Sequence, residues 1–182
     1  LDTTATRSRL VFRPSMFYSK FSSKLNLYFN YYVRSSFPDF FSIMPYTDNS
    51  DPLSVTVNNP NLKNSLFHHY DFNLRLSGLK NQQYVGFFIT GNFYHNNVSM
   101  RTRYNTQTGG YTYMSDNIGG GGNWDFWSTI SYGTALDKAR LFRLDYKLWV
   151  NGLRRKEFDI AYDDDPMQIC YTFNSELGNS LY

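Results

Sequence analysis

Apolar and polar residues alternate along several segments of the chain. In residues 24–34 the odd positions are apolar or aromatic and the even positions include Asn26, Asn30 and Arg34. Residues 70–77 and 142–151 repeat this period of two. Because successive side chains of a β-strand point to opposite faces, each segment predicts a strand with one apolar and one polar face. Such strands separate lipid from lumen in the wall of a transmembrane barrel.

The two faces give two sets of candidate residues. The candidate lumen-facing residues are Asn26, Asn30, Arg34, Asp71, Asn73, Arg75, Arg143, Asp145 and Lys147. The candidate lipid-facing residues are Leu25, Leu27, Phe29, Phe72, Leu74, Phe142, Leu144 and Leu148. The mixed charge of the first set argues against strong selectivity for one sign of ion. These polar residues could contact a solute. A role in solvating the wall or in holding a plug explains them equally well.

Period two predicts about six strands of barrel length and the start of a seventh. They cover residues 8–18, 24–34, 66–79, 84–104, 111–132 and 142 to the acidic run at 163–165, and 168–174 starts the seventh. Pro14 marks a strand edge, bulge or end, since proline cannot donate to the ladder. The glycine run 119–122 lacks the features of a phosphate loop and predicts a kink or bulge. Residues 178–182 lack the alternation expected of a final strand.

The connections alternate in length. Short ones fall near residues 19, 81 and 137, and longer ones near 48, 107 and 163, the longest covering 35–65. Outer-membrane barrels have short periplasmic turns and longer extracellular loops, so we expect the long connections to face outward. Several predicted strands exceed the roughly 9 to 11 residues that cross a bilayer, so they should project beyond it.

The number of strands is too small for a closed barrel, which needs about eight. An open edge in lipid leaves backbone groups unpaired at a cost of several kcal/mol each. We therefore predict an all-β, antiparallel transmembrane β-barrel segment of about 6 to 7 strands. Residues 1–182 form a single piece of wall in this interpretation, with an outer loop at 35–65 and no plug domain.

Composition agrees with a barrel and excludes other classes. Aromatic residues make up 19% of the 182 residues, as aromatic girdles require. The sequence contains no run of about 18 apolar residues, so it predicts no membrane-spanning helix. The net charge of +3 is dispersed, which argues against binding nucleic acid. Cys170 is the only cysteine, so the sequence holds no disulfide framework.

A loop motif carries a family resemblance. The connection between two predicted strands contains three short motifs in order: Phe-Pro-Asp at 37–39, Ser-Asp-Pro-Leu at 50–53 and Asn-Pro-Asn-Leu-Lys at 59–63. The segment resembles the late barrel region of TonB-dependent receptors and, more narrowly, the outer-membrane β-barrel family related to them. The motif positions are Asp51, Pro52, Asn59, Pro60 and Leu62. Asn58 replaces the usual glycine, and asparagine tolerates left-handed backbone better than most residues.

The resemblance implies a barrel of about 22 strands with an N-terminal plug. It further implies TonB-driven import of a nutrient or chelate across the bacterial outer membrane. The implied partners are outer-membrane lipid, the rest of the barrel and its plug, the TonB system and a surface lipoprotein. Two alternatives stay open: a structural or partner-docking barrel in an outer-membrane complex, and a soluble, aromatic-rich glycan-binding β-module.

Other candidate chemistry is weaker. The acidic run 163–165 offers oxygen ligands for calcium, but its spacing favours a solvated turn. His68 and His69 are adjacent, so they point to opposite faces of a strand and cannot form one site. No nucleophile, base and orienting acid occur as a set, so we expect no enzymatic activity, cofactor or metal.

Overall fold

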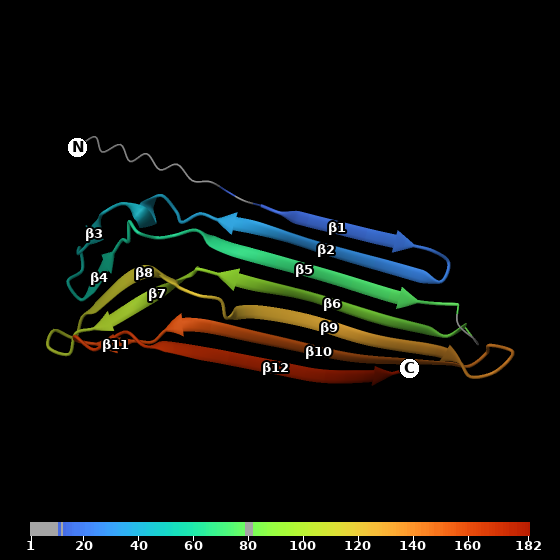
Figure 1. The fold of residues 1–182 in the computed structure, drawn as a ribbon. Helices are drawn as coiled ribbons and strands as arrows, with labels where there is room; N and C mark the ends of the chain where they lie inside the picture. The colour runs from blue at the N-terminus through green and yellow to red at the C-terminus, as the bar shows by residue number, and fades with distance from the viewer. Residues whose placement is uncertain (1–10, 12, 79–81) are drawn as a thin grey trace.

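The computed structural model describes residues 11, 13–78 and 82–182, which form two β-sheets (Figure 1). Helical structure among these residues is of the 3-10 type and occurs at η1 (Phe41–Ile43) and at Gln82. None of the described helical residues forms a segment long and apolar enough to cross a membrane.

The main sheet has seven antiparallel strands in the order β1-β2-β5-β6-β9-β10-β12. These strands are β1 (Ser15–Phe21), β2 (Leu25–Ser36), β5 (Ser65–Leu76), β6 (Tyr84–His95), β9 (Asn123–Ala135), β10 (Arg143–Phe158) and β12 (Ile169–Leu181). The long strands lie side by side as an open, single layer with β1 and β12 at its edges (Figure 1). This arrangement confirms the predicted all-β, antiparallel fold.

The second sheet has five strands in the order β11-β7-β8-β4-β3. These strands are β3 (Thr47–Asp48), β4 (Ser54–Val57), β7 (Asn97–Tyr104), β8 (Tyr111–Ile118) and β11 (Ala161–Tyr162). The β7–β8 hairpin prolongs β6 and β9, while β4 and β11 add to it as parallel strands. β3 and β4 lie in the connection 35–65, which was predicted to resist regular structure, whereas β7, β8 and β11 lie in segments predicted as strands.

The junction between the sheets changes two predicted strands. The strand predicted at 84–104 is broken at Asn96, whose φ of 54° places it in the left-handed region. Asparagine adopts this conformation more readily than most residues, so the alternation continues across the break without revealing it. The strand predicted at 111–132 is interrupted where expected, since the glycine run 119–122 separates β8 from β9.

Several strand ends differ from the predictions. β1 begins after Pro14, whose carbonyl accepts a hydrogen bond of 2.9 Å from Val33, so this proline lies at the end of an edge strand as predicted. β1 extends to Phe21, beyond the predicted turn at residue 19. The predicted positions 8–10, 12 and 79–81 lie outside the described residues. β12 continues to Leu181, so residues 178–181 are in a strand although they lack the alternation expected of a final strand.

The connections separate by length onto two ends of the main sheet. The connections β1–β2, β5–β6 and β9–β10 lie at one end, and the second sheet with the longer connections lies at the other (Figure 1). This asymmetry agrees with the predicted alternation of short turns and long loops.

Four of the five buried apolar side chains among the described residues lie toward the second sheet. These buried apolar side chains are Val33, Leu62, Ile118, Ala161 and, at the short-turn end of β9, Ala135. Large apolar residues in the middle of the main sheet stay exposed, including Phe93 at 51% and Ile130 at 47%. The main sheet therefore has no packed protein core over its apolar face within the described residues.

Candidate functional site

The cross-strand register sorts the main sheet into an apolar face and a polar face. One row on the apolar face runs through Leu27, Leu74, Phe87, Ile130 and Leu148. The neighbouring row on the polar face runs through Asn26, Arg75, Gly86, Ser131 and Lys147. Since paired residues share a face, the alternation noted in separate segments is in phase across five strands.

The candidate residues follow these faces. The polar face carries the lumen-facing candidates Asn26, Asn30 and Arg34 in β2, Asp71, Asn73 and Arg75 in β5, and Arg143, Asp145 and Lys147 in β10. The apolar face carries Leu25, Leu27, Phe29, Phe72, Leu74, Leu144 and Leu148. Phe142 lies outside β10, in the connection 136–142, where its carbonyl accepts a 2.9 Å hydrogen bond from Leu136.

A histidine network, formed by His69, Asp71, Asn92, Tyr94 and Asp125, links β5, β6 and β9 on the polar face. His69 Nε2 lies 2.8 Å from an Asp71 carboxylate oxygen, and its Nδ1 lies 2.7 Å from Asn92 Oδ1. Asn92 Nδ2 donates to Asp125 at 2.6 Å, and the Tyr94 hydroxyl donates to the other Asp125 oxygen at 3.0 Å. Both ring nitrogens of His69 thus lie within hydrogen-bond distance of side-chain oxygen atoms.

Aromatic and cationic side chains extend this network into β2. The Tyr32 ring stacks on His69 at a centroid distance of 4.7 Å, and the Arg34 guanidinium lies 4.8 Å from the Tyr32 ring centroid. His68 points to the other face, where its Nδ1 lies 3.1 Å from the Tyr31 hydroxyl. The prediction that the two histidines cannot share a site is confirmed.

A second polar cluster surrounds Tyr84 nearer the short turns. The Tyr84 hydroxyl donates to Asp145 at 2.8 Å, and the other Asp145 oxygen forms an ion pair of 2.8 Å with Arg143. The guanidinium groups of Arg75 and Arg143 lie 4.5 and 5.3 Å from the Tyr84 ring centroid. Three predicted lumen-facing residues thus meet around a tyrosine that the candidate list did not include.

Sequence analysis missed Tyr84, Asn92, Tyr94 and Asp125 as site residues. Each occupies a polar-face position in a strand whose existence was predicted, so alternation assigns it to the correct face. The partners depend on which residues stand opposite each other, and that register is not visible in one strand alone.

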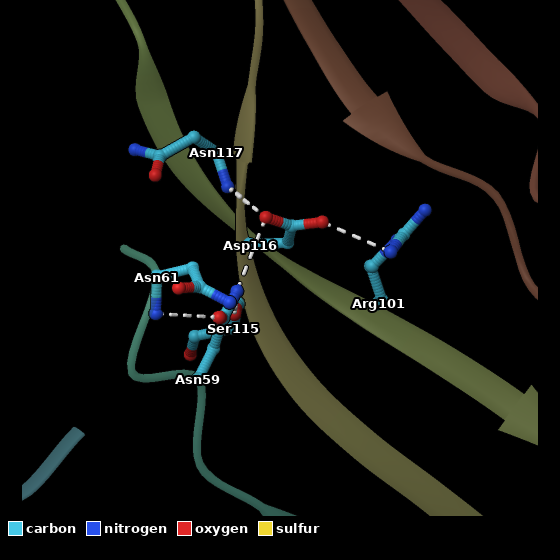
Figure 2. A network of polar contacts seen from close by, with 6 residues as sticks. All are labelled: Asn59, Asn61, Arg101, Ser115, Asp116 and Asn117. Atoms are coloured by element: carbon cyan, nitrogen blue, oxygen red, sulfur yellow. Dashed lines mark hydrogen bonds and ion pairs between the residues drawn. The ribbon is translucent and has the colours of Figure 1, made fainter. Parts of the chain in front are cut away.

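The Asn-Pro-Asn-Leu-Lys step of the loop motif attaches the long loop to β8 (Figure 2). Asn59 Nδ2 donates to the Ser115 carbonyl at 3.1 Å and to Asp116 Oδ1 at 3.2 Å. Asp116 also accepts a hydrogen bond from the Asn117 amide and forms a 2.9 Å ion pair with Arg101. Figure 2 shows Asp116 between the loop and the β7 arginine.

A second set of bonds completes this attachment. Asn117 Oδ1 accepts a 2.6 Å hydrogen bond from the Lys63 amide, while its Nδ2 donates to the carbonyls of Lys63 and Asn96. Leu62 is 1% exposed, the most buried large side chain among the described residues. This motif step therefore fixes the loop at the junction of the sheets.

The Ser-Asp-Pro-Leu step attaches the same loop to the other end of β8. Asp51 accepts a hydrogen bond of 2.9 Å from the Leu53 amide, and the Leu53 carbonyl accepts one of 2.8 Å from Tyr111. A side chain on Gly110 would lie 3.3 Å from Leu53 Cα and from the Pro52 carbonyl, so this approach favours glycine. The motif residues position a loop, and we assign them no ligand.

Asp163 connects β11 to the β7–β8 hairpin. Its carboxylate accepts hydrogen bonds from the Thr106 hydroxyl at 2.6 Å and amide at 2.8 Å, which lower the pKa of Asp163. Its amide donates to the Tyr104 carbonyl at 2.8 Å, and Arg103 bonds to its carbonyl. No group of three His, Cys, Asp or Glu side chains suited to a metal occurs within the described part of the chain.

An open antiparallel sheet with one apolar and one polar face, short turns at one end and long loops at the other defines the wall of a transmembrane barrel. A family model described as the outer membrane protein beta-barrel family matches residues 1–145. The chain belongs to this family, which places it in the bacterial outer membrane. Comparison with curated proteins and with solved structures gave no match.

Proposed function

We propose that the chain forms part of the wall of a TonB-dependent-type outer-membrane transporter that imports a nutrient or chelate. The family supports an outer-membrane barrel, and the loop motif at residues 37–63 adds the resemblance to TonB-dependent receptors. The observation that carries the proposal is the polar face, where hydrogen-bonding side chains from β2 to β12 line one side of the sheet.

The apolar face meets lipid in this proposal. Exposed side chains such as Phe93 and Ile130 are stable there, because hydrocarbon replaces the missing protein core. β2, β5 and β6 contain 12 residues each, enough for the roughly 9 to 11 that span a bilayer, and β10 contains 16. β10 therefore projects beyond the membrane on the side of the long loops.

The polar face lines the lumen. The histidine network and the Tyr84 cluster hold Asp71, Asp125 and Asp145 in hydrogen bonds, which lowers the cost of placing these carboxylates inside a barrel. The backbone edges of β1 and β12 require partners in lipid, since each unpaired group costs several kcal/mol. Further strands complete the wall, with a plug inside and the TonB system as energy source.

A structural or partner-docking barrel is the second candidate. The second sheet favours it, because its outer strands β3 and β11 offer edges to a partner such as a surface lipoprotein. We do not propose the soluble glycan-binding module as a function of this chain. It requires the apolar face to be covered by protein, whereas Ile130 and Phe93 are about half exposed within the described residues.

Uptake by intact cells tests transport. Cells with and without this protein are grown on a complex medium, and depletion of solutes from the medium is measured by mass spectrometry. We expect at least one solute to be depleted only when the protein and a functional TonB system are both present. Depletion that is independent of TonB would contradict energised import. Unchanged depletion in cells without the protein would favour the docking candidate.

A further inference from the structure

Four tyrosines gather on one face of the second sheet. Tyr104, Tyr111, Tyr113 and Tyr162 come from β7, β8 and β11, and we call this surface the tyrosine face. The ring of Tyr104 lies 4.9 Å from that of Tyr111 and 5.9 Å from that of Tyr162, between centroids. Tyr111 and Tyr113 stack with their planes 16° apart. The aromatic rings therefore form a continuous surface.

The tyrosine face is open and uncharged over its centre. Tyr111 is 39% exposed and Tyr162 is 52% exposed. Within the described residues, none of the four hydroxyl groups has a hydrogen-bond partner. Among the described strand residues of the second sheet, the register places one carboxylate on this side, that of Asp48 in the edge strand β3, which accepts a hydrogen bond of 3.1 Å from the Ser50 amide. An occupant must offer hydrogen bonds and apolar contact without needing an opposite charge.

The tyrosine face is fixed before any ligand arrives. Asp163 holds Tyr162 beside Tyr104 through its bonds to Thr106 and to the Tyr104 carbonyl. Asn105 closes the hairpin, with its side-chain oxygen accepting hydrogen bonds from Gln107 and Thr108. Tyrosine also loses little conformational entropy on binding, since it has few rotatable bonds. A preorganised surface of this kind lowers the entropic cost of binding.

A cavity of about 440 Å³ lies where the β7–β8 hairpin meets the polar face of the main sheet. It is lined by Phe67 and Tyr94 of the polar face and by Val98 and Ser115. Val98 shares a side of β7 with Tyr104, and Ser115 shares a side of β8 with Tyr111. The lining residues do not include the four tyrosines, so this cavity lies beside the histidine network on the same side of the second sheet as the tyrosine face.

We propose that the tyrosine face binds a neutral oligosaccharide. Sugar rings present C–H groups on their faces and hydroxyls at their rims, which match exposed aromatic rings and unpaired phenol hydroxyls. The uncharged centre selects against ionic ligands, because charged groups lose hydration without gaining a partner. This inference rests on the proposed transport function, because it names the class of substrate that would be imported. Binding of the oligosaccharide itself does not require transport.

Saturation-transfer NMR on the full-length protein in detergent micelles tests the inference. The probes are maltohexaose, cellohexaose and xylohexaose, and a hexapeptide of alternating Lys and Glu serves as the charged comparison. We expect at least one saccharide to bind and Tyr104→Ala and Tyr111→Ala each to weaken it by about tenfold. Tyr111→Phe should keep the ring contact and lose a smaller part of the affinity.

Tyr171→Ala is the matched control. Tyr171 is 56% exposed, close to the 52% of Tyr162, but lies in β12 away from the tyrosine face. Its replacement should leave binding unchanged, and the outer-membrane assembly of every variant is checked first. Failure of all three saccharides to bind, binding of the peptide alone, or unchanged affinity in both alanine variants would overturn the inference. Saccharide binding without uptake in cells would refute only transport.

Discussion

The main sheet and the second sheet are built from the same strand geometry but are held together differently. Each strand of the main sheet pairs with the main-sheet strand that precedes or follows it in the chain, and both faces alternate in phase. The second sheet joins segments far apart in sequence, including parallel pairs of two and four residues. Side chains of Asn59, Asp116, Asn117 and Asp163 connect those segments.

This difference separates two sources of stability. In the main sheet, the proposed contact of the apolar face with lipid leaves backbone pairing to hold the strands, so individual side chains on that face should be interchangeable if they stay apolar. In the second sheet, short strands depend on named polar side chains and on one deeply buried leucine. Substitutions should therefore act through polarity in the main sheet and through particular contacts in the second.

Leu62→Ala should have the largest effect and should be confined to the second sheet. The Leu62 side chain is 1% exposed, and truncating a buried leucine costs about 2 to 5 kcal/mol. We expect faster backbone hydrogen exchange in residues 47–62 and 111–118, while the middle of the main sheet keeps its protection. Equal loss of protection in both sheets would show that they unfold as one unit.

Leu148→Arg should destabilise the main sheet by about 2 to 4 kcal/mol if this residue faces lipid near the membrane centre. Leu148 lies nearer the middle of β10 than the candidate Leu144, which is second in that strand. Asn151→Arg, on the polar face of the same strand, is the matched control and should assemble normally. Urea unfolding in lipid vesicles measures the difference, and equal stability of the two variants would contradict the facing assignment.

Asp116→Ala should loosen the junction by about 1 to 3 kcal/mol, because it removes the ion pair with Arg101 and the acceptor of the Asn117 amide, and leaves Asn59 only the Ser115 carbonyl. Limited proteolysis of intact cells should then cleave within residues 37–64, where the wild type resists. Asp39→Ala serves as a control, since Asp39 bonds only within its own turn, to Phe41. Equal cleavage of both variants would argue that Asp116 does not hold the loop.

Acid should weaken the attachment of β11 to the β7–β8 hairpin, and we expect this loss of stability to be the smallest of the four effects. Hydrogen bonds from Thr106 lower the pKa of Asp163, so its stabilising contribution is complete above the ordinary pKa of aspartate. This contribution is lost as the pH falls through the lowered pKa, because the protonated form accepts these bonds less well. NMR of the Thr106 amide should follow this titration, and Asp163→Asn should remove it. A pH-independent Thr106 signal in the wild type would contradict the assignment.

The alternation of apolar and polar residues was sufficient to predict the strands of the main sheet, because it depends only on residues within one strand. The phase of residues 24–34 and 142–151 can be read from the sequence, and an up-and-down order needs no further information. The break at Asn96 escaped detection because asparagine is polar and fits the alternation on either side. Only the start of β12 was predicted, since Gly178 and Asn179 are poor strand residues on an edge that gains its pairing from β10.

The site was predicted only in part, for a physical reason. Arg75, Arg143 and Asp145 were assigned to the polar face, but their meeting around Tyr84 depends on the register of four strands. The loop motif was recognised, yet its role in docking on β8 required a partner more than 50 residues away, as the Asn59–Ser115 bond with its separation of 56 shows. Contacts between distant segments carry no local pattern.

Cysteine accessibility along β5 tests the central claim most directly. Cys170 is first replaced by serine, which leaves a cysteine-free chain. Single cysteines at Asn73, Leu74, Arg75 and Leu76 are then treated in outer membranes with a small charged thiol reagent and with a lipid-soluble maleimide. The account predicts that positions 73 and 75 react with the charged reagent and 74 and 76 only with the maleimide. The reverse pattern, or equal labelling at all four positions, would contradict a wall with lipid on one face and a lumen on the other.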